Sequence, residues 1–503
     1  MNKVVFVAAP ICILAAAAGA VPWYLGVQHE RTMRAEVSKL SSRAQFPLNL
    51  TVTHYDRGWL SSSAVVRFTV KAEPSLYLDV RQDIAQWPDP RVGWVRVRSV
   101  PQWTGPAKGV FDYYFGGQPA LTIDTVVGFD GSGKTTLNSP AFSKPSQHDP
   151  AATVSWGGLQ GTMSLGADRH WVASATMPHL RVEGGDTQGG IKALQFDATW
   201  DLHGTVADWQ GETKLALAEF RFSGPREQVA LRDLSGAAYQ RNKGDNVLLG
   251  YALRVGAGSS AKAGQAEDSF SNAVLDLEFD QIDKKALTKC VDDLGNTEHP
   301  AAQDQQATQT MMDLAAQLLR GSPVMRLKKL GVETPSGTMS AQATVSFDGS
   351  NLADTRFSPE LLSRLKAKAN VEIAAGLLRS QLQRKARPQV EVVLQQRGAQ
   401  STEENIQTLS DKLTEVQLKN LTDNGILRSN GTSFTIEAEL TGGQVTVNGQ
   451  PADRLFGGIA LPPLPLEQPT PSARPEFRAG IGPAGPLSLV QDGAPQATVS
   501  SAR

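Results

Sequence analysis

Cysteine is almost absent from this chain of 503 residues. Its two cysteines are Cys12, inside an apolar N-terminal run, and Cys290, far downstream. This count excludes a disulfide scaffold and a zinc site built from thiolates, and we predict no disulfide between the two. The seven histidines form no H-x-x-x-H or H-E-x-x-H pair, so the sequence predicts no metal site.

An excess of either charge is also missing. The chain has 49 basic and 50 acidic residues, which leaves a net charge of −1. Because no global field attracts polyanions, we predict no nucleic-acid partner. No G-x-S-x-G elbow or other motif assigns a nucleophile, a general base or an oxyanion donor. We therefore predict a protein that is not an enzyme, with no catalytic residues and no cofactor.

Tryptophan is missing from the C-terminal half, since all nine tryptophans lie at or before Trp209. This shift in composition predicts two regions with differently built cores, a β-rich region over 28–285 and an α+β region over 286–458. The remaining sequence is rich in proline and has no apolar period, so we predict a disordered tail over 459–503. A polyproline ligand at Pro462–Pro465 is the alternative to a plain solvated tail.

The chain does have one long apolar run, Val4–Val27, which contains no charged residue. As a helix it would be about 36 Å long, enough to cross a hydrocarbon core of ~30 Å. We predict a membrane anchor over 4–27, with Trp23 and Tyr24 at the membrane interface. A cleaved signal peptide is the alternative, because Ala18-Gly19-Ala20 fits the small-x-small cleavage pattern.

Alternation of apolar and polar residues recurs along the chain. In Leu194–Leu202 every even position is apolar and every odd position is polar, and Leu275–Asp280 and Phe434–Leu440 repeat this design. Such alternation predicts strands with one face on a core and the other in water. Gly442-Gly443 predicts a β-hairpin after the third strand. Short strands of this kind favour a mainly β fold, a β-rich α+β protein built on a large, curved antiparallel meander.

Helical signals are few. We predict a short helix over 28–43, a helix over Ala307–Arg320, and another that begins at Ser358-Pro359. Ser401–Glu404 is a capping box that opens an amphipathic helix ending near Gly425. We predict that its apolar stripe packs against the sheet, with binding of a partner helix as the alternative. The stripe consists of Ile406, Leu409, Leu413, Val416 and Leu421.

Gly128–Thr135 fits the phosphate-loop pattern G-x-x-x-x-G-K-[ST]. A working phosphate loop joins a buried strand to a helix whose N-terminus holds the phosphates. Pro140 and Pro145 interrupt any helix after the match, and Leu121–Val126 alternates like a half-exposed strand. We therefore predict a hairpin with a tight turn at Asp130–Gly133, and no nucleotide binding.

The segment His54–Ala64 reads HYDRGWLSSSA. A Y-x-R-G-aromatic-x-x-S block soon after an N-terminal hydrophobic segment resembles the YdgA-like family, a bacterial family of unknown function. The turn Thr334–Gly337 and the hairpin Gly442–Gly449 are similar to later features of that family. The residues that carry the first likeness are Tyr55, Arg57, Gly58, Trp59 and Ser62.

The resemblance implies a single-pass protein of the bacterial inner membrane with most of its chain in the periplasm. It carries over no catalytic residues. The basic residues after the apolar run would by themselves favour the opposite orientation. We expect a structural role for the signature residues, in which Tyr55 and Trp59 anchor a turn that Gly58 permits and Arg57 is paired nearby. A binding role is the alternative.

For the function, we predict a non-enzymatic envelope protein that binds a lipid or another apolar envelope component. Lipid-transfer proteins of the AsmA-like kind use large sheets curved around an apolar groove, and the predicted sheet is analogous to these. The alternative is a structural or assembly factor that binds protein partners in the cell envelope.

Overall fold

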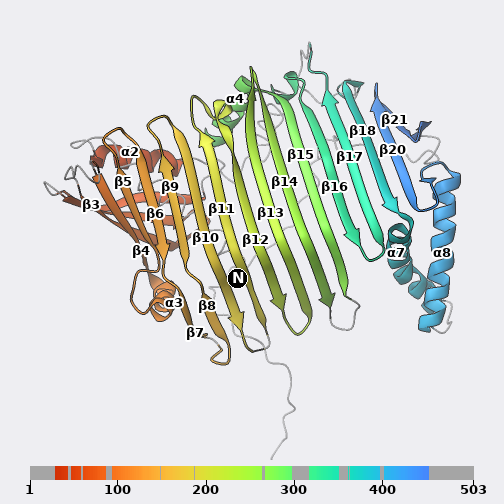
Figure 1. The fold of residues 1–503 in the computed structure, drawn as a ribbon, viewed down its shortest axis with the longest axis horizontal. Helices are drawn as coiled ribbons and strands as arrows, with labels where there is room; N and C mark the ends of the chain where they lie inside the picture. Colours follow the sequence, from red (N-terminus) through yellow and green to blue (C-terminus); the bar gives the residue numbers. More distant parts are fainter. Residues whose placement is uncertain are drawn as a thin grey trace, which may run out of the picture. The chain divides into compact units, whose positions relative to one another are not determined.

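The strands among the described residues form one antiparallel sheet of 22 strands (Figure 1). All belong to a compact unit that ends at Leu455. The predicted mainly β fold, with a large antiparallel sheet and few helices, is confirmed. The computed structural model describes residues 29–452 except 43–46, 58–60, 86–92, 94, 148, 186, 263–266, 297–316, 351–360, 362 and 397–400.

The strands fall into an N-terminal, a central and a C-terminal set. The N-terminal set is β1 (Leu48–Arg57), β2 (Ser61–Val70), β3 (Glu73–Ala85), β4 (Val95–Trp103), β5 (Thr122–Val127), β6 (Gly133–Ser139), β7 (Phe142–Pro145), β8 (Thr153–Trp156) and β9 (Leu159–Leu165). The central set is β10 (His170–Glu183), β11 (Gln188–Asp201), β12 (Gln210–Ser223), β13 (Glu227–Lys243), β14 (Asn246–Lys262) and β15 (Asp268–Asp283). The C-terminal set is β16 (Val324–Thr334), β17 (Gly337–Phe347), β18 (Leu365–Ala374), β19 (Arg428–Ser429), β20 (Ser433–Thr441), β21 (Gln444–Val447) and β22 (Gln450–Pro451).

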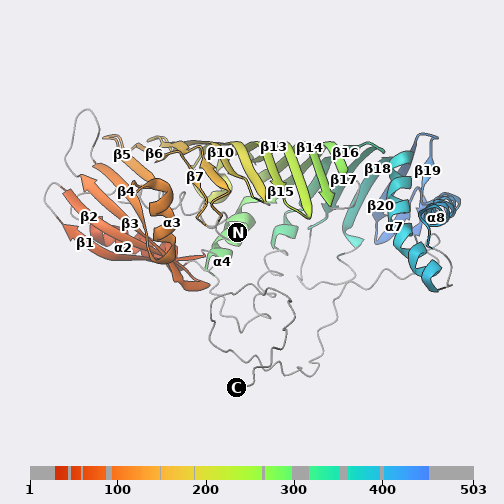
Figure 2. The same cartoon turned by 90° about the horizontal axis from the view of Figure 1, so that it is seen from below.

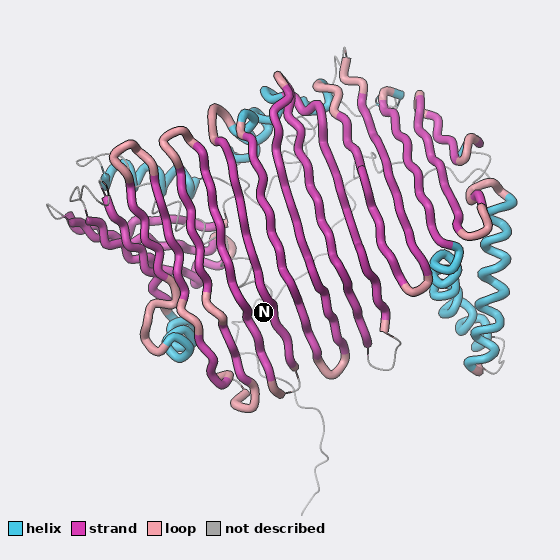
Figure 3. The backbone as a smooth tube through the Cα atoms, in the orientation of Figure 1, coloured by secondary structure: helices cyan, strands magenta, loops and turns pink. Residues whose placement is uncertain are grey.

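The sheet is a meander in which strands adjacent in sequence lie side by side (Figure 3). Three pairings skip along the chain: β6 with β9, β8 with β10, and β18 with β20. β7 pairs with β8, so β6 and β7 lie end to end in one row of the sheet. β8 and β9 likewise lie end to end in the next row, because both pair with β10. The pairing passes without interruption from β15 to β16, so one sheet spans both regions predicted from the composition.

One face of this sheet is apolar across nearly its whole width. Residues opposite each other in an antiparallel pair point to the same face, so the register defines rows that cross the sheet. We call the side that carries the following row the apolar face. The row runs through Tyr55, Ala64, Gln82, Ser99, Ile123, Leu137, Gly161, Ala175, Phe196, Leu215, Gly236, Leu253, Leu275, Leu330, Ala341, Val371 and Ile436.

A transverse crease crosses the central strands. In the five successive pairings from β10 to β15, the register leaves out one residue on each strand. Three of these residues have left-handed backbones, with φ of 52° at Ala193, 53° at Asp233 and 49° at Asn272. An unpaired residue of this kind bends its strand as a β-bulge does. The residues of the crease are Pro178, Ala193, Ala218, Asp233, Gly256 and Asn272.

The crease changes the spacing of apolar residues along each strand, but these residues stay on the same face of the sheet. On β12, Leu217 and Phe220 are three residues apart across the crease, whereas the other apolar neighbours are two apart. Trp156, which lies opposite Leu180 beyond the crease, donates its Nε1 proton to Ser139 Oγ at 3.0 Å. Ser139 lies two residues along β6 from the member of the row on that strand, so its side chain points to the apolar face. Trp156 and its register partner Leu180 therefore point to the same face. The apolar face therefore continues to both ends of the long strands.

Helices cover the two ends of the apolar face. α2 packs on β1, α3 contacts β4 and β7, and α7 contacts β17 and β18 and pairs with α8. α4 contacts β15 and the short helix η2. Figure 2 shows α3, α4 and α7 on the same side of the sheet. The described helices are α2 (His29–Ser42), α3 (Gly105–Phe115), η2 (Val206–Asp208), α4 (Lys284–Asn296), α7 (Ala375–Gln396) and α8 (Glu403–Asp423).

The predicted short helix over 28–43 and the hairpin around Gly442-Gly443 are confirmed as α2 and as β20 with β21. α3 and α7 are not predicted from the sequence. α7 follows β18 directly and contains Pro388, which removes a helical hydrogen bond and argues against a helix. It forms because Val390 and Leu394 are buried in a cluster with Ile406 of α8.

The prediction for α8 needs two corrections. The N-cap is Thr402, whose Oγ1 accepts a hydrogen bond from Asn405 N at 3.3 Å, so the expected capping box is out of register by one residue. Leu409 and Val416 do not pack inward, because they are 39% and 55% exposed. The first half of the helix packs on α7, and only its last turns reach the sheet, through Leu418.

Several predicted segments lie outside the described residues. These are the anchor over 4–27, the tail over 459–503, and most of the helices expected over 307–320 and from Ser358. Residues 317–320 are helical. Among the helices that the structure describes, none is long and apolar enough to span a membrane.

Candidate apolar binding face

Between the covering helices, the apolar face is open in the part of the chain that the structure describes. Under α2, by contrast, Val66 and Phe68 are 0% and 2% exposed. Contiguous exposed apolar surface of this kind marks an interaction site in soluble domains. Six large apolar side chains of the open part are 36% to 49% exposed, and each lies in a central strand or in β16 beside them: Leu215, Phe220, Phe222, Tyr251, Leu253 and Leu330.

A shallow hollow of about 320 Å³ lies in this open part. Its floor includes Gly236 and Ala238, and its walls include Leu215, Tyr251 and Leu253. A Cβ on Gly236 would meet only Ala252 O, at 3.9 Å, so the hollow exists because this position has no side chain. A concave, apolar site of this size matches the lower end of ligand pockets.

The polar group in the hollow is already satisfied. Thr213 Oγ1 accepts a hydrogen bond from Trp200 Nε1 at 2.9 Å. The hollow therefore offers apolar contact and little polar recognition. Within the described residues, no three histidine, cysteine, aspartate or glutamate side chains are grouped so that they could hold a metal ion. The absence of cofactors and catalytic residues stays a prediction.

The opposite face is polar, and its buried carboxylates are paired. Tyr239 Oη donates to Glu278 Oε1 at 2.6 Å, and Lys328 Nζ donates to the same atom at 2.7 Å. Burial opposes ionisation of the Glu278 carboxyl, but the hydrogen bonds from Lys328 and Tyr239 outweigh it and lower its pKa. Burial, together with the hydrogen bond to Glu278, raises the pKa of Tyr239 to about 12. The phenol therefore remains a proton donor at neutral pH.

Asp280 repeats this arrangement two residues along β15. It accepts hydrogen bonds from Arg326 Nη1 at 2.7 Å and from Lys243 Nζ at 3.0 Å. Burial opposes ionisation here too, and the hydrogen bonds from Arg326 and Lys243 overcome it, so the pKa of the Asp280 carboxyl is lowered. These donors are used in holding β13, β15 and β16 together, and we interpret this network as structural.

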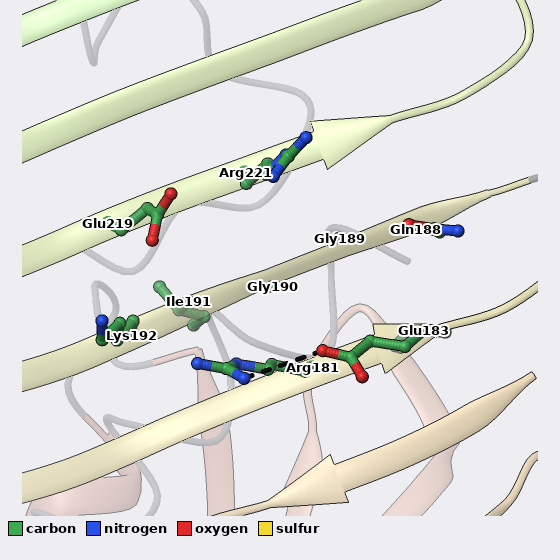
Figure 4. A pocket seen from close by; sticks show the side chains of 10 residues that line it. Arg181, Glu183, Gln188, Gly189, Gly190, Ile191, Lys192, Glu219 and Arg221 are labelled. Atoms are coloured by element: carbon green, nitrogen blue, oxygen red, sulfur yellow. Dashed lines mark ion pairs between the residues drawn. The ribbon is translucent and has the colours of Figure 1, made fainter.

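A charged hollow of about 260 Å³ lies near the other end of the polar face (Figure 4). Gly190 leaves a gap between its register partners Arg181 and Arg221. Figure 4 shows Arg181 directed toward Glu183, and their Nη1 and Oε1 atoms are 3.7 Å apart. Solvent-exposed charges of both signs contribute little interaction energy, so we assign this hollow no ligand.

The sequence signature lies at the start of the sheet rather than in the open part. Tyr55 is half-buried on β1 and packs against the cluster under α2. Ser62 is buried and lies opposite the exposed Arg57 in the first hairpin. Gly58 and Trp59 lie outside the described residues. The expected role of these residues in anchoring a turn therefore stays a prediction.

The other two family-like segments form connections between strands. Thr334–Gly337 is the turn from β16 to β17. The buried Asn448, after β21, accepts a hydrogen bond from Glu437 N at 2.9 Å. Its Nδ2 donates to Gly425 O at 2.9 Å and to Ile426 O at 3.0 Å. Asn448 thereby joins β20 to the loop after α8, which gives this part of the likeness a structural explanation.

The phosphate-loop match over 128–135 forms a hairpin. β5 and β6 pair antiparallel on its two sides. Gly128 N donates to Ser132 O at 2.8 Å, and Ser132 N donates to Asp130 Oδ1 at 3.0 Å, so the predicted tight turn is confirmed. Lys134 lies within β6 and therefore lacks the helix N-terminus that a phosphate loop needs.

The fold and the open face together define a class of protein, a mainly β scaffold with one extended apolar surface. Over residues 1–453 the chain matches a family described as bacterial protein of unknown function (DUF945). Because the match spans most of the chain, the protein belongs to this family. No curated protein sequence matches the chain.

Proposed function

We propose that the open part of the apolar face binds a lipid or another apolar component of the cell envelope, and that the protein is not an enzyme. The exposure of Leu215, Tyr251 and Leu253 around the hollow carries this proposal. Removing such surface from water is favourable by about 25 cal/mol per Å². An apolar ligand that covers these side chains is therefore held without a charged partner.

We also propose that residues 4–27 hold the protein in the bacterial inner membrane as a single-pass anchor, with the bulk of the chain in the periplasm. The uncharged run over these residues supports the anchor. The likeness to the YdgA-like family, which we propose as the narrower grouping within DUF945, supports the compartment. A cleaved signal peptide would export the same sheet and leave the proposed binding unchanged.

A structural or assembly factor that binds protein partners is the second candidate. A specific observation favours it: α7 and α8 carry a second set of exposed apolar side chains. Val392 is 51% exposed, Val393 is 44% exposed and Val416 is 55% exposed. Exposed apolar side chains on these helices fit a protein partner that docks through apolar contacts.

Native mass spectrometry of the full-length chain, extracted in mild detergent, tests the lipid proposal. We expect co-purifying lipid in the wild type. Gly236→Leu fills the hollow and should lower lipid occupancy at least several-fold without unfolding the sheet, because the position has open space and no left-handed backbone. The control is Gly109→Leu on α3, where a Cβ also meets nothing within 4 Å.

Bound lipid that is lost in Gly236→Leu and kept in Gly109→Leu supports the proposal. Wild-type protein that carries no lipid, or equal occupancy in both variants, contradicts it. Co-purification of a protein that is lost when Val416 is replaced by lysine would favour the second candidate instead.

A further inference from the structure

A second cavity lies at the edge of the apolar face, where the loops after β9 and β11 meet. Its volume is about 440 Å³, which is larger than that of the hollow around Gly236. Its lining combines apolar side chains with two basic ones, Arg169 and His203. The lining residues are Leu165, Arg169, Leu202, His203, Gly204 and Trp209.

The edge cavity connects to the apolar face through tryptophan side chains. Leu165 lies opposite Trp171, and Trp171 lies opposite Trp200, so all three share the apolar face. Trp200 packs over Gly211, where a Cβ would lie 2.7 Å from its ring, and it donates to Thr213 of the hollow. From Trp209, which directly precedes β12, to Leu215 in the hollow, the extended chain spans about 20 Å.

The backbone at Arg169 is held in a conformation that does not suit its side chain. Its φ is 61°, in the left-handed region where a bulky residue costs about 1 kcal/mol or more. Arg169 N donates to Gly166 O at 3.0 Å, and Leu202 N donates to Arg169 O at 3.0 Å, which fixes this geometry from both sides. Glycine or asparagine would be more stable here, so the side chain of an arginine indicates a use for its charge.

The charge of Arg169 is not neutralised within the described structure. Neither Arg169 nor His203 has a side-chain hydrogen bond or ion pair among the described residues. Three carboxylates are near the lining residues in sequence, and all are engaged. Asp208 accepts from Thr205 Oγ1 at 2.8 Å and from Lys284 Nζ at 3.2 Å. Asp168 Oδ1 accepts from His170 N at 3.1 Å, and Asp201 lies 2.6 Å from His170 Nδ1, on the polar face. The edge cavity therefore presents a cationic group beside an apolar surface.

We propose that the edge cavity binds the anionic headgroup of an amphiphile whose apolar chain lies on the open face. This inference rests on the proposed function and narrows its ligand to a negatively charged lipid. Arg169 supplies charge-assisted hydrogen bonds to the headgroup, and His203 supplies a second donor at the same cavity. The first part of the lipid's apolar chain contacts Leu165, Leu202 and Trp209.

Binding of two lipids that differ only in headgroup tests this inference. The probes are short-chain phosphatidylglycerol and phosphatidylcholine with identical acyl chains, titrated below their micellar concentrations into the full-length protein. We expect the wild type to prefer phosphatidylglycerol by about tenfold, because its headgroup has a net negative charge, whereas the choline cation of phosphatidylcholine offsets the phosphate that Arg169 would bind. Arg169→Gly should abolish this preference.

Two further variants, Arg169→Asn and Arg254→Gln, serve as controls. Arg169→Gly and Arg169→Asn both suit a left-handed backbone, so their melting temperatures should equal or exceed that of the wild type. Arg254→Gln removes an exposed charge from the polar face of the same sheet and should keep the preference. The inference is overturned if the wild type binds both lipids equally, or if Arg254→Gln loses the preference to the same extent. Binding of neither lipid would overturn the proposed function, and with it this inference.

Discussion

On β2, Val66 and Phe68 are 0% and 2% exposed, whereas Leu215 on β12 and Tyr251 on β14 are 48% and 47% exposed. All four belong to the same face of one sheet, and in each strand large apolar residues recur at every second position. The difference is that α2 covers the first pair, while the described structure leaves the second pair open. Alternation therefore builds an apolar face, but only a covering element turns that face into a core.

The largest effect should come from truncating matched phenylalanines in the two regions. Phe68→Ala removes a fully buried ring and should lower the free energy of unfolding by about 3–5 kcal/mol. Phe222→Ala, at a side chain 39% exposed, should cost less than about 1 kcal/mol. Urea unfolding followed by circular dichroism measures both. Equal losses would show that the open region is covered as tightly as the region under α2.

Two glycines that face opposite sides of the sheet extend the comparison. A Cβ on Gly250 would lie 2.0 Å from the Tyr239 ring, so Gly250→Ala should destabilise the protein by about 1–3 kcal/mol. Gly236→Ala, in the floor of the open hollow, should leave the melting temperature unchanged or raise it, since glycine destabilises a strand interior. A comparable loss of stability in Gly236→Ala would mean that its surroundings are closed.

The smallest effect concerns pH. The pKa of Asp280 is lowered from its ordinary value of 3.8, so its contribution to stability is full above that value and is lost as pH falls through the lowered one. Asp280→Asn should cost about 1 kcal/mol at pH 7 and should flatten the loss of stability between pH 5 and pH 2. Urea midpoints across this range measure the slope.

Leu253→Ala is the control for this pH dependence. The open face contributes no titrating group at that position, so the variant should keep the wild-type slope. An unchanged slope in Asp280→Asn would show that the paired carboxylates of the polar face do not set the acid sensitivity.

Much of the fold follows from the sequence, because alternation is a local property. Leu194–Leu202 identifies β11, and Gly442-Gly443 identifies the last hairpin, without any knowledge of their partners. Pro140 excludes a helix after the phosphate-loop match, and the effect of a proline on a helix is equally local. These features are predictable because each depends on a few neighbouring residues.

The open face is not predictable in the same way. Large apolar residues recur at every second position around Leu215 as they do around Val66, and only tertiary packing distinguishes the two regions. The crease depends on the alignment of Ala193 with unpaired residues on five other strands, which no single segment reveals. α7 forms despite Pro388 because α8 packs on it, and Thr402 rather than Ser401 caps α8. Arg169 gains its significance from a backbone angle that the sequence does not show.

The central claim is that the apolar face holds a lipid in the intact protein. A photoreactive amino acid at Leu253 tests it in living cells, with the same residue at Val172 as a control. Val172 is 38% exposed and faces the polar side of the sheet. We predict lipid adducts by mass spectrometry from position 253 and none from position 172. Protein adducts alone at 253, or lipid adducts at both positions, would contradict the account.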